Sequence, residues 1–376
     1  MYRISKELAT LAEQGNFRHI PLPQGASGAD FSSNDYLGIG ADTHLQQEFF
    51  NSISGNCPSL TSSASRLLAQ DQEEYYLLEA ALERLYGKPA LLFNSGYHAN
   101  TGLISALCDK KTLIVADKLV HASIIDGYKL SDAEMARFRH NDINHLESIL
   151  QAKAGNYERV LIVVESIYSM DGDSAPLEEI AVLKSRYPQA LLYVDEAHAF
   201  GVCGPRGLGL VASTPIAGTV DVIVGTFGKA AASVGAFAVL SGELKDYAIN
   251  RARSFIFSTA IPPLNCAWTR YVIERLPGAD MAVRRGRLKE LIKEFSINLD
   301  PDKVQLSSPS HIIPIIVGDS AKAVSLSAKL AEEGLKVLPI RTPTVPPHTE
   351  RLRISLSAAL QLSDVCRLAS SLNRLL

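Results

Sequence analysis

The sequence contains no uninterrupted apolar stretch of the length needed to cross a bilayer, which takes about 20 residues in a helix. Residues 1–17 carry apolar side chains at helical intervals, without the continuous apolar core of a signal peptide. The chain also lacks an excess of positive charge, because its net charge is −3. These absences argue against a membrane or a nucleic acid as a partner and predict a cytoplasmic protein.

Cysteine is scarce and scattered. The cysteines form no CxxC pair and have no metal-finger spacing, so the sequence predicts no metal site. Their odd number suits a reducing compartment, where each serves as a small buried hydrophobe. They are Cys57, Cys108, Cys203, Cys266 and Cys366.

The sequence does have the composition of a folded protein of more than one unit. Of its 376 residues, 47% are hydrophobic and 20% are charged, which is ordinary globular composition. A chain of this length exceeds one average domain, and no internal repeat or low-complexity tract interrupts it. We therefore expect two or three units around well-packed cores.

Three apolar segments rich in β-branched residues predict parallel strands: 160–165, 191–195 and 220–226. They begin roughly thirty residues apart, which is the length of a βαβ unit. Between the first two, residues 174–187 open on serine, proline and two glutamates, as a helix start does, and keep an apolar face to Tyr187. This alternation predicts an α/β fold with a mostly parallel sheet and helices on both of its faces.

Further elements and a change of character divide the chain. Residues 90–93 and 112–116 are shorter strand candidates that precede the three above. After residues 261–263 the pattern becomes a long charged helix followed by alternating strands and helices, which predicts a smaller α+β domain. These later elements are expected at 281–295, 311–317, 321–333 and 351–356. The predicted division is an N-terminal arm (1–35), a large α/β domain (36–260) and a C-terminal α+β domain (261–376).

Polar residues follow the predicted strands, where open α/β sheets bind their ligands. The set combines acids, histidines, hydroxyl groups and one lysine. Its members are Ser95, Gly96, Tyr97, Asp117, His121, Glu165, Ser169, Asp195, His198, Thr226 and Lys229.

The letters DEAH at 195–198 also spell a helicase box. That interpretation requires a glycine-rich loop whose lysine binds nucleotide phosphates. The nearest fragment, residues 225–230, lacks both the spacing of that loop and the hydroxyl group after the lysine. The helicase hypothesis is abandoned unless the protein hydrolyses ATP.

A lysine after one strand and an aspartate at the end of its neighbour suit pyridoxal phosphate (PLP). This cofactor needs an amine for its Schiff base and a carboxylate facing its ring nitrogen, and Lys229 and Asp195 supply both. It also needs a phosphate site. Residues 95–97, at the start of a predicted helix, offer backbone N–H groups and the positive end of a helix dipole.

Several motifs then resemble one known family. FSSNDYLG (31–38), DKLVHAS (117–123), SMDGDSAPL (169–177), DEAH (195–198) and TFGK (226–229) resemble, in order, the motifs of the α-oxoamine synthases. These are fold-type I PLP enzymes, of the aspartate aminotransferase-like fold, that condense an amino acid with an acyl thioester and release carbon dioxide. The run IRTPTVPP (340–347) with RLRIS (351–355) is similar to the branch that makes 8-amino-7-oxononanoate in biotin biosynthesis.

The resemblance implies roles at the cofactor ring. Lys229 would form the Schiff base and then act as the base that takes the substrate Cα proton. Asp195 would pair with the pyridine nitrogen and His121 would stack on the ring. His198 and Ser169 would hydrogen-bond the phenolic oxygen.

It also implies roles around the phosphate and the substrate. Ser95, Gly96, Tyr97 and Thr226 would hold the phosphate, with Ser258 or Thr259 reaching it from a partner subunit. Arg341 would clamp the substrate carboxylate, because a planar guanidinium binds it through two hydrogen bonds. Arg18 and Asn34 would contact substrate as well.

The resemblance further implies a homodimer with the active site at the subunit interface. The expected substrates are L-alanine and a pimeloyl thioester, carried on coenzyme A or on an acyl carrier protein. Two alternatives stay open. One is a glycine-using relative of the 2-amino-3-ketobutyrate CoA ligase or 5-aminolevulinate synthase type. The other is a non-catalytic partner subunit, against which the retained Lys229 argues.

Taken singly, each residue also has a structural explanation. Asp195 could accept backbone N–H groups, His121 could bond a carbonyl, and Lys229 could be solvated at a helix start. Arg341 could bond loop carbonyls and Tyr97 could be a packing aromatic. The cofactor hypothesis is stronger because all of them fall, in order, where one cofactor needs them.

Two segments depart from the family pattern. Residues 59–66 contain no glycine where relatives have a glycine-rich loop, so we expect their backbone to avoid positive φ. The alanines at 230–232 stand where relatives tend to carry glycines. A basic cluster at 284–289 predicts a solvated helix face, with a docking site for an acyl carrier as the alternative.

Overall fold

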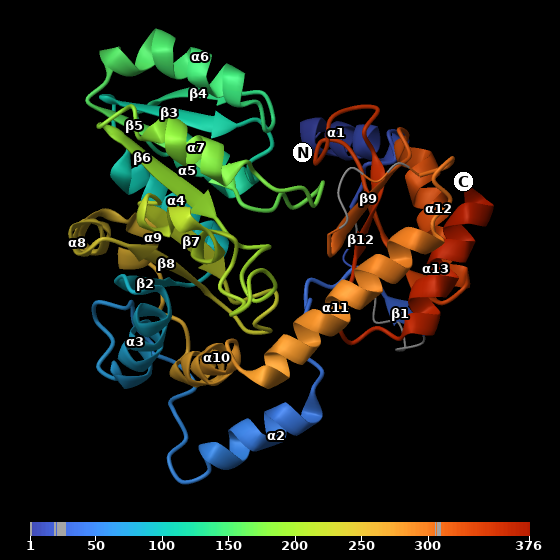
Figure 1. Cartoon of the computed structure of the whole chain (residues 1–376), viewed down its shortest axis with the longest axis horizontal. Helices are drawn as coiled ribbons and strands as arrows, with labels where there is room; N and C mark the ends of the chain where they lie inside the picture. Colours follow the sequence, from blue (N-terminus) through green and yellow to red (C-terminus); the bar gives the residue numbers. More distant parts are fainter. Residues whose placement is uncertain (1, 19, 21–27, 305, 307–309) are drawn as a thin grey trace. The chain divides into compact units, whose positions relative to one another are not determined.

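The computed structural model describes residues 2–18, 20, 28–304, 306 and 310–376 (Figure 1). Its contacts divide the chain into a larger unit, Leu37–Ser169 with Ser174–Arg285, and a smaller one, Met1–Tyr36 with Met170–Asp173 and Gly286–Leu376. Part of the predicted N-terminal arm, residues 1, 19 and 21–27, lies outside the described residues.

The larger unit is built on a seven-stranded sheet in the order β2-β8-β7-β6-β5-β3-β4. All neighbouring pairs from β7 to β4 are parallel, whereas β8 is antiparallel to both β2 and β7. The strands are β2 (Ala90–Phe93), β3 (Thr112–Asp117), β4 (Glu134–Phe138), β5 (Arg159–Glu165), β6 (Ala190–Asp195), β7 (Val222–Thr226) and β8 (Ala236–Leu240). The predicted mostly parallel sheet is confirmed.

Helices cover this sheet on both faces. Leu161, Val163 and Tyr193 point from one face into a core shared with α4 (Gly96–Leu107) and α5 (Ala122–Lys129). Side chains alternate between the two faces of a strand, and on the other face α7 packs on β6. The remaining helices of this unit are α2 (Thr43–Ser52), α3 (Glu73–Tyr86), α6 (Ile143–Lys153), α7 (Leu177–Lys184), α8 (Gly242–Arg251), α9 (Arg253–Ile256) and α10 (Pro263–Arg275).

The smaller unit is α+β, as predicted. Its antiparallel sheet has the order β11-β12-β9, and a two-residue parallel pair joins β1 to β10. Its strands are β1 (Ala29–Asp30), β9 (Ile312–Ile316), β10 (Leu335–Lys336), β11 (Leu338–Ile340) and β12 (Arg351–Ser355). Its helices are α1 (Tyr2–Glu13), α12 (Ser320–Glu332) and α13 (Leu362–Leu375), while α11 (Ala279–Asn298) contributes residues to both units.

The contacts place the boundary between the two units after Arg285, whereas the sequence predicted it after residue 260. Helix α10 packs on α3, so the larger unit extends to Arg285. The N-terminal segment is joined to the smaller unit, because Ala29 N donates to Gly334 O at 2.8 Å and Phe31 N donates to Lys336 O at 2.8 Å. The division into units thus follows sheet and helix pairing more than the order of the chain.

Three local expectations were wrong. Helix α7 ends at Lys184, so Tyr187 is not on its apolar face. Ser63 has φ 48°, although no glycine is present; the residue is exposed and its N–H donates to Thr61 Oγ1 at 3.0 Å. The cluster at 284–289 is not simply solvated, because Arg285 is 5% exposed and donates to Leu276 O at 2.8 Å.

No helix within the described residues is both long and apolar enough to cross a membrane. The cytoplasmic location stays a prediction.

Candidate active site

The carboxyl ends of three parallel strands bring polar side chains to one edge of the larger unit's sheet. Glu165 ends β5 and lies in register with Asp195, which ends β6, and Asp195 lies in register with Val224 of β7. Thr226 ends β7 two residues later. Glu165, Asp195 and Thr226 are buried, so a shared low-dielectric environment strengthens their interactions.

Lys229 is placed by a tight turn after β7. Phe227 N donates to Gly235 O at 2.9 Å, and Ala232 N donates to Lys229 O at 2.9 Å. Ala232 has φ 46°, the left-handed conformation that glycine adopts at less cost. The turn sets Lys229 Nζ 2.7 Å from Nε2 of the buried His198, so the predicted lysine and histidine are together.

The Asp195 carboxylate is oriented by two donors. Oδ1 accepts Ala197 N at 2.9 Å and Oδ2 accepts Asn100 Nδ2 at 2.8 Å. Asn100 is 1% exposed on α4 and was not predicted as a site residue. The sequence signal that could have revealed it is a single amide on an otherwise apolar helix face, because a buried amide needs hydrogen-bond partners.

His121 caps the first turn of α5. Its Nδ1 accepts Ser123 N at 3.2 Å and lies 2.8 Å from Ser123 Oγ, while the residue as a whole is exposed. Desolvation lowers the pKa of His121 below its usual 6.5, the Asp195 charge opposes that shift, and the Lys229 charge adds to it. The ring is therefore held at one nitrogen and open to a ligand.

Glu165 lies behind this cluster. Burial raises the pKa of its carboxyl well above the usual 4.5, and the neighbouring Asp195 charge raises it further. Backbone hydrogen bonds from His121 and Ser169 act in the opposite direction. Glu165 therefore lies close to the backbone of His121 and of Ser169 at this edge of the sheet.

The start of α4 forms an anion site with Thr226. Ser95 is the N-cap of this 12-residue helix and its Oγ accepts His98 N at 3.2 Å. A Cβ added to Gly96 would lie 3.7 Å from Thr226 Cβ, so the missing side chain leaves a cradle between them. Unpaired backbone N–H groups and the helix dipole favour a phosphate there.

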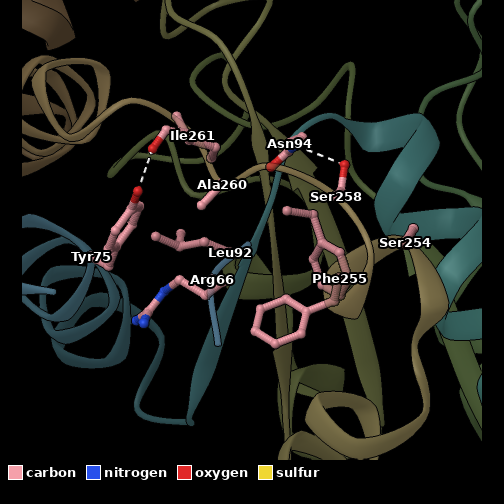
Figure 2. A pocket seen from close by; sticks show the side chains of 10 residues that line it. Arg66, Tyr75, Leu92, Asn94, Ser254, Phe255, Ser258, Ala260 and Ile261 are labelled. Atoms are coloured by element: carbon pink, nitrogen blue, oxygen red, sulfur yellow. Dashed lines mark hydrogen bonds between the residues drawn. The ribbon is translucent and has the colours of Figure 1, made fainter. Parts of the chain in front are cut away.

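Tyr97, Ser258 and Thr259 lie near this helix start with other partners. Tyr97 is 47% exposed and donates to Asp126 Oδ2 at 2.6 Å. Asn94 Nδ2 donates to Ser258 Oγ at 3.1 Å, as Figure 2 shows, and to the Thr259 carbonyl. The pocket in Figure 2 holds only about 10 Å³, room for one water, so it is not the cofactor site. Phosphate binding by these three side chains stays a prediction.

The predicted substrate residues belong to the smaller unit. Arg18 and Arg341 line one pocket of about 260 Å³. Arg18 Nη2 donates to Thr344 Oγ1 at 3.1 Å, and Arg341 Nη1 donates to a carbonyl, that of Gly15. The two arginines are thus together within this unit.

Asn34 is not in that pocket. Its Oδ1 accepts the Tyr36 hydroxyl at 2.9 Å and Arg353 Nη1 at 3.2 Å, so it belongs to a polar cluster inside the smaller unit. A role of Asn34 in substrate contact stays a prediction.

These residues fit pyridoxal phosphate. A lysine, a buried carboxylate, a partly open imidazole and a cradled helix start occur together in the larger unit. Across the described residues, no group of three or more His, Cys, Asp or Glu side chains could hold a metal ion.

Comparison with known proteins identifies the relatives of the chain. The family model for aminotransferases of class I and II matches residues 27–372. The chain is 45% identical to a provisionally named 8-amino-7-oxononanoate synthase of Pasteurella multocida strain Pm70, and the match covers 98% of each sequence.

Two solved structures are similar over nearly the whole chain. One is SPT, serine palmitoyltransferase, with PLP, at 28% identity and a TM-score of 0.89, covering 99% of this chain and 96% of that one. The other is an 8-amino-7-oxononanoate synthase from Francisella tularensis, at 28% identity and a TM-score of 0.77, covering 93% and 97%.

Site and relatives agree on the chemistry. Pyridoxal phosphate is the cofactor, the fold is the fold-type I transferase fold, and the chain is an acyltransferase-type enzyme. The chain belongs to the class I and II aminotransferase family and, within it, to the α-oxoamine synthases.

Proposed function

We propose that this enzyme condenses L-alanine with a pimeloyl thioester and releases carbon dioxide and the free thiol, which gives 8-amino-7-oxononanoate for biotin synthesis. The observation that carries the proposal is the Lys229–His198 pair beside Asp195, in a chain 45% identical to a protein named for this product. The thioester is carried on coenzyme A or on an acyl carrier protein.

Lys229 and His198 handle the proton of the substrate Cα. Lys229 would hold the cofactor through its amine Nζ and would act as the general base toward the Cα proton of the amino acid. His198 Nε2, 2.7 Å away, limits where Nζ can lie. His198 and Ser169 also donate to or accept from the phenolic oxygen of the cofactor.

Asp195 holds a proton on the ring nitrogen. When bound, pyridoxal phosphate supplies a protonated ring that takes up the electron pair left at Cα. Asp195 is buried and already accepts two hydrogen bonds, and its remaining lone pairs accept the ring N–H. His121 stacks on the ring, and Ser95, Gly96, Tyr97 and Thr226 hold the phosphate.

Arg341 binds the carboxylate of the amino acid, and Arg18 and Asn34 contact substrate. Arginine suits this task because its planar fork donates two parallel hydrogen bonds to a carboxylate. The pocket that Arg18 and Arg341 share supports this role by placing two cationic groups together.

We propose a homodimer in which Ser258 or Thr259 of one subunit reaches the phosphate of the other. Exposed apolar side chains around the start of α4 support an interface there: Leu130 is 70% exposed and Phe257 is 69% exposed, and both line one pocket with Tyr97. Light scattering of the purified protein tests this, with a mass of two chains expected and a monomer contradicting it.

A competition assay tests the substrates. Purified enzyme with PLP receives pimeloyl-CoA and an equimolar mixture of L-alanine, glycine and L-serine, and the products are identified by mass. We expect the alanine-derived amino ketone to dominate, with carbon dioxide released in equal amount. A dominant glycine or serine product would replace the proposed substrate. No product with any acyl-CoA would favour the non-catalytic partner subunit.

A further inference from the structure

Two buried side chains, Asn100 and Ser123, connect Asp195 and His121, the residues assigned to the cofactor ring, and a third, Tyr193, holds Asn100. Tyr193 donates from its hydroxyl to Asn100 Oδ1 at 2.7 Å. Asn100 Nδ2 lies 2.8 Å from Asp195 Oδ2 and 2.9 Å from Ser123 Oγ, which in turn lies 2.8 Å from His121 Nδ1. Tyr193, Asn100, Ser123 and Asp195 are at most 5% exposed, so water cannot substitute for these partners.

The direction of each hydrogen bond in this chain is determined. An ionised carboxylate only accepts, so the Asn100 NH₂ faces Asp195 and its carbonyl faces Tyr193. Burial raises the pKa of Tyr193 well above its usual 10, so its hydroxyl keeps the proton it donates. Ser123 Oγ receives the second Asn100 N–H, and its own hydrogen is left to point at His121.

His121 Nδ1 therefore accepts twice, from the Ser123 hydroxyl and from Ser123 N at 3.2 Å. A nitrogen toward which two donors point carries no proton. We infer that Asn100 is a positioning residue that, through Ser123, holds His121 as the neutral imidazole with its proton on Nε2, while it orients the Asp195 carboxylate. This inference rests on the cofactor roles proposed above for Asp195 and His121.

Protonation of His121 would have to occur at Nδ1 and would break both hydrogen bonds there. The charged and titratable groups that face the imidazole act in both directions. The Asp195 and Asp126 charges favour the imidazolium and the Lys229 charge opposes it, and Glu165 interacts with the His121 backbone. Partial desolvation of the imidazole also opposes the imidazolium and so lowers the pKa of His121.

The network serves the ring chemistry in two ways. A neutral imidazole adds no second positive charge near the ring nitrogen whose proton Asp195 holds, and so does not weaken that proton's attraction to the ring. The single Asn100 amide also couples the two residues, because its hydrogens are shared between Asp195 and Ser123.

Nitrogen NMR of imidazole-labelled protein tests the inference, with the His121 signals assigned by their loss in His121→Asn. In wild type, with and without PLP, we expect Nδ1 unprotonated and Nε2 protonated at pH values above the usual histidine pKa of 6.5. In Asn100→Ala and Ser123→Ala we expect mixed tautomers and a His121 pKa closer to 6.5. The dissociation constant of PLP should rise about tenfold in Asn100→Ala, as for one lost charge-assisted hydrogen bond.

Ser105→Ala is the matched control, because Ser105 also lies on α4 and donates only to the carbonyls of Thr101 and Gly102. It should leave the His121 signals unchanged. If Asn100→Ala does not fold, Ser123→Ala takes its place: it removes the hydroxyl group next to His121 Nδ1 and should mix the tautomers.

A proton on Nδ1 in wild type, or an unaltered His121 in Asn100→Ala or, in its place, Ser123→Ala, would overturn the inference. Nε2-protonated His121 in an enzyme that does not use alanine would uphold it and contradict the proposed substrates alone.

Discussion

The cofactor residues of the larger unit and the arginine pocket of the smaller unit are built in opposite ways. Asp195 and His198 are at most 5% exposed, and Asp195 is held by the buried Asn100. Arg18 is exposed and Arg341 half-buried, and both bond loop oxygens. Buried hydrogen bonds fix geometry, and long exposed side chains adapt to what they bind. The proposed cofactor site is thus held by buried hydrogen bonds, and the proposed substrate site by more exposed arginines.

The largest expected effect follows from removing the lysine of the cofactor site. Lys229→Ala should reduce turnover of alanine by about a thousandfold or more, because both the Schiff base and the general base are lost. Steady-state rates at saturating substrate measure this, with the exposed Lys110→Ala as control. A loss of less than tenfold would show that another group takes the Cα proton.

Asp195→Asn should lower turnover about a hundredfold, because an amide holds the ring proton less strongly than a carboxylate. The substitution keeps the size of the side chain, but its single oxygen can accept from Ala197 N or from Asn100 Nδ2 and not from both, so the Asn100 amide must turn its carbonyl toward the new NH₂. Circular dichroism checks the fold alongside the kinetics. Turnover equal to wild type would leave Asp195 with a structural role only.

Glu196→Gln tests whether burial raises the pKa of a carboxyl group near the site. Glu196 is 0% exposed, and its Oε1 accepts Leu210 N and Val211 N, both at 3.1 Å, which a glutamine oxygen can also do. Burial raises the pKa of Glu196 to about 7. Because the folded-state pKa is raised, its contribution to stability is complete below about pH 4.5 and is lost as the pH rises through about 7.

Between pH 4.5 and pH 8 the free energy of unfolding of wild type should therefore fall by about 3 kcal/mol because of Glu196, and the glutamine variant should not show this fall. Urea unfolding at several pH values measures this. The exposed Glu290→Gln, outside the larger unit, is the control and should match wild type. Parallel pH curves for Glu196→Gln and wild type would contradict the predicted role of burial.

Arg341→Lys should have the smallest effect and the most selective one. Lysine keeps the charge and loses the two-pronged geometry, so the KM for alanine should rise about tenfold. The dissociation constant of PLP should be unchanged, because the cofactor residues lie in the other unit. A parallel loss of PLP binding would break the proposed division between cofactor and substrate regions.

The sequence predicted the central strands well, because residues 160–165 and 191–195 are each apolar up to the carboxylate that ends the run. It did not reveal β4, an edge strand with a single buried residue, or the alanine-rich β8. Neither has the continuous β-branched pattern of a central parallel strand.

The sequence predicted the site residues that lie in motifs typical of cofactor binding. It did not predict a residue such as Asn100, which holds another site residue in place. Lys229, His198, Asp195 and His121 were expected, and the structure brings them to one edge of the sheet. Asn100 was missed because its partners, Tyr193 and Ser123, are far from it in sequence. Residues 59–66 misled for a related reason: absence of glycine did not reveal that exposed Ser63 could take a positive φ.

The most direct test of the account is to locate the cofactor on the chain. Wild-type enzyme loaded with PLP is reduced with borohydride, digested, and mapped by mass spectrometry. The account predicts one modified peptide with the pyridoxyl group on Lys229, and none in Lys229→Ala. A pyridoxyl group on another lysine, or an unmodified wild type, would contradict the assignment of this sheet edge as the cofactor site.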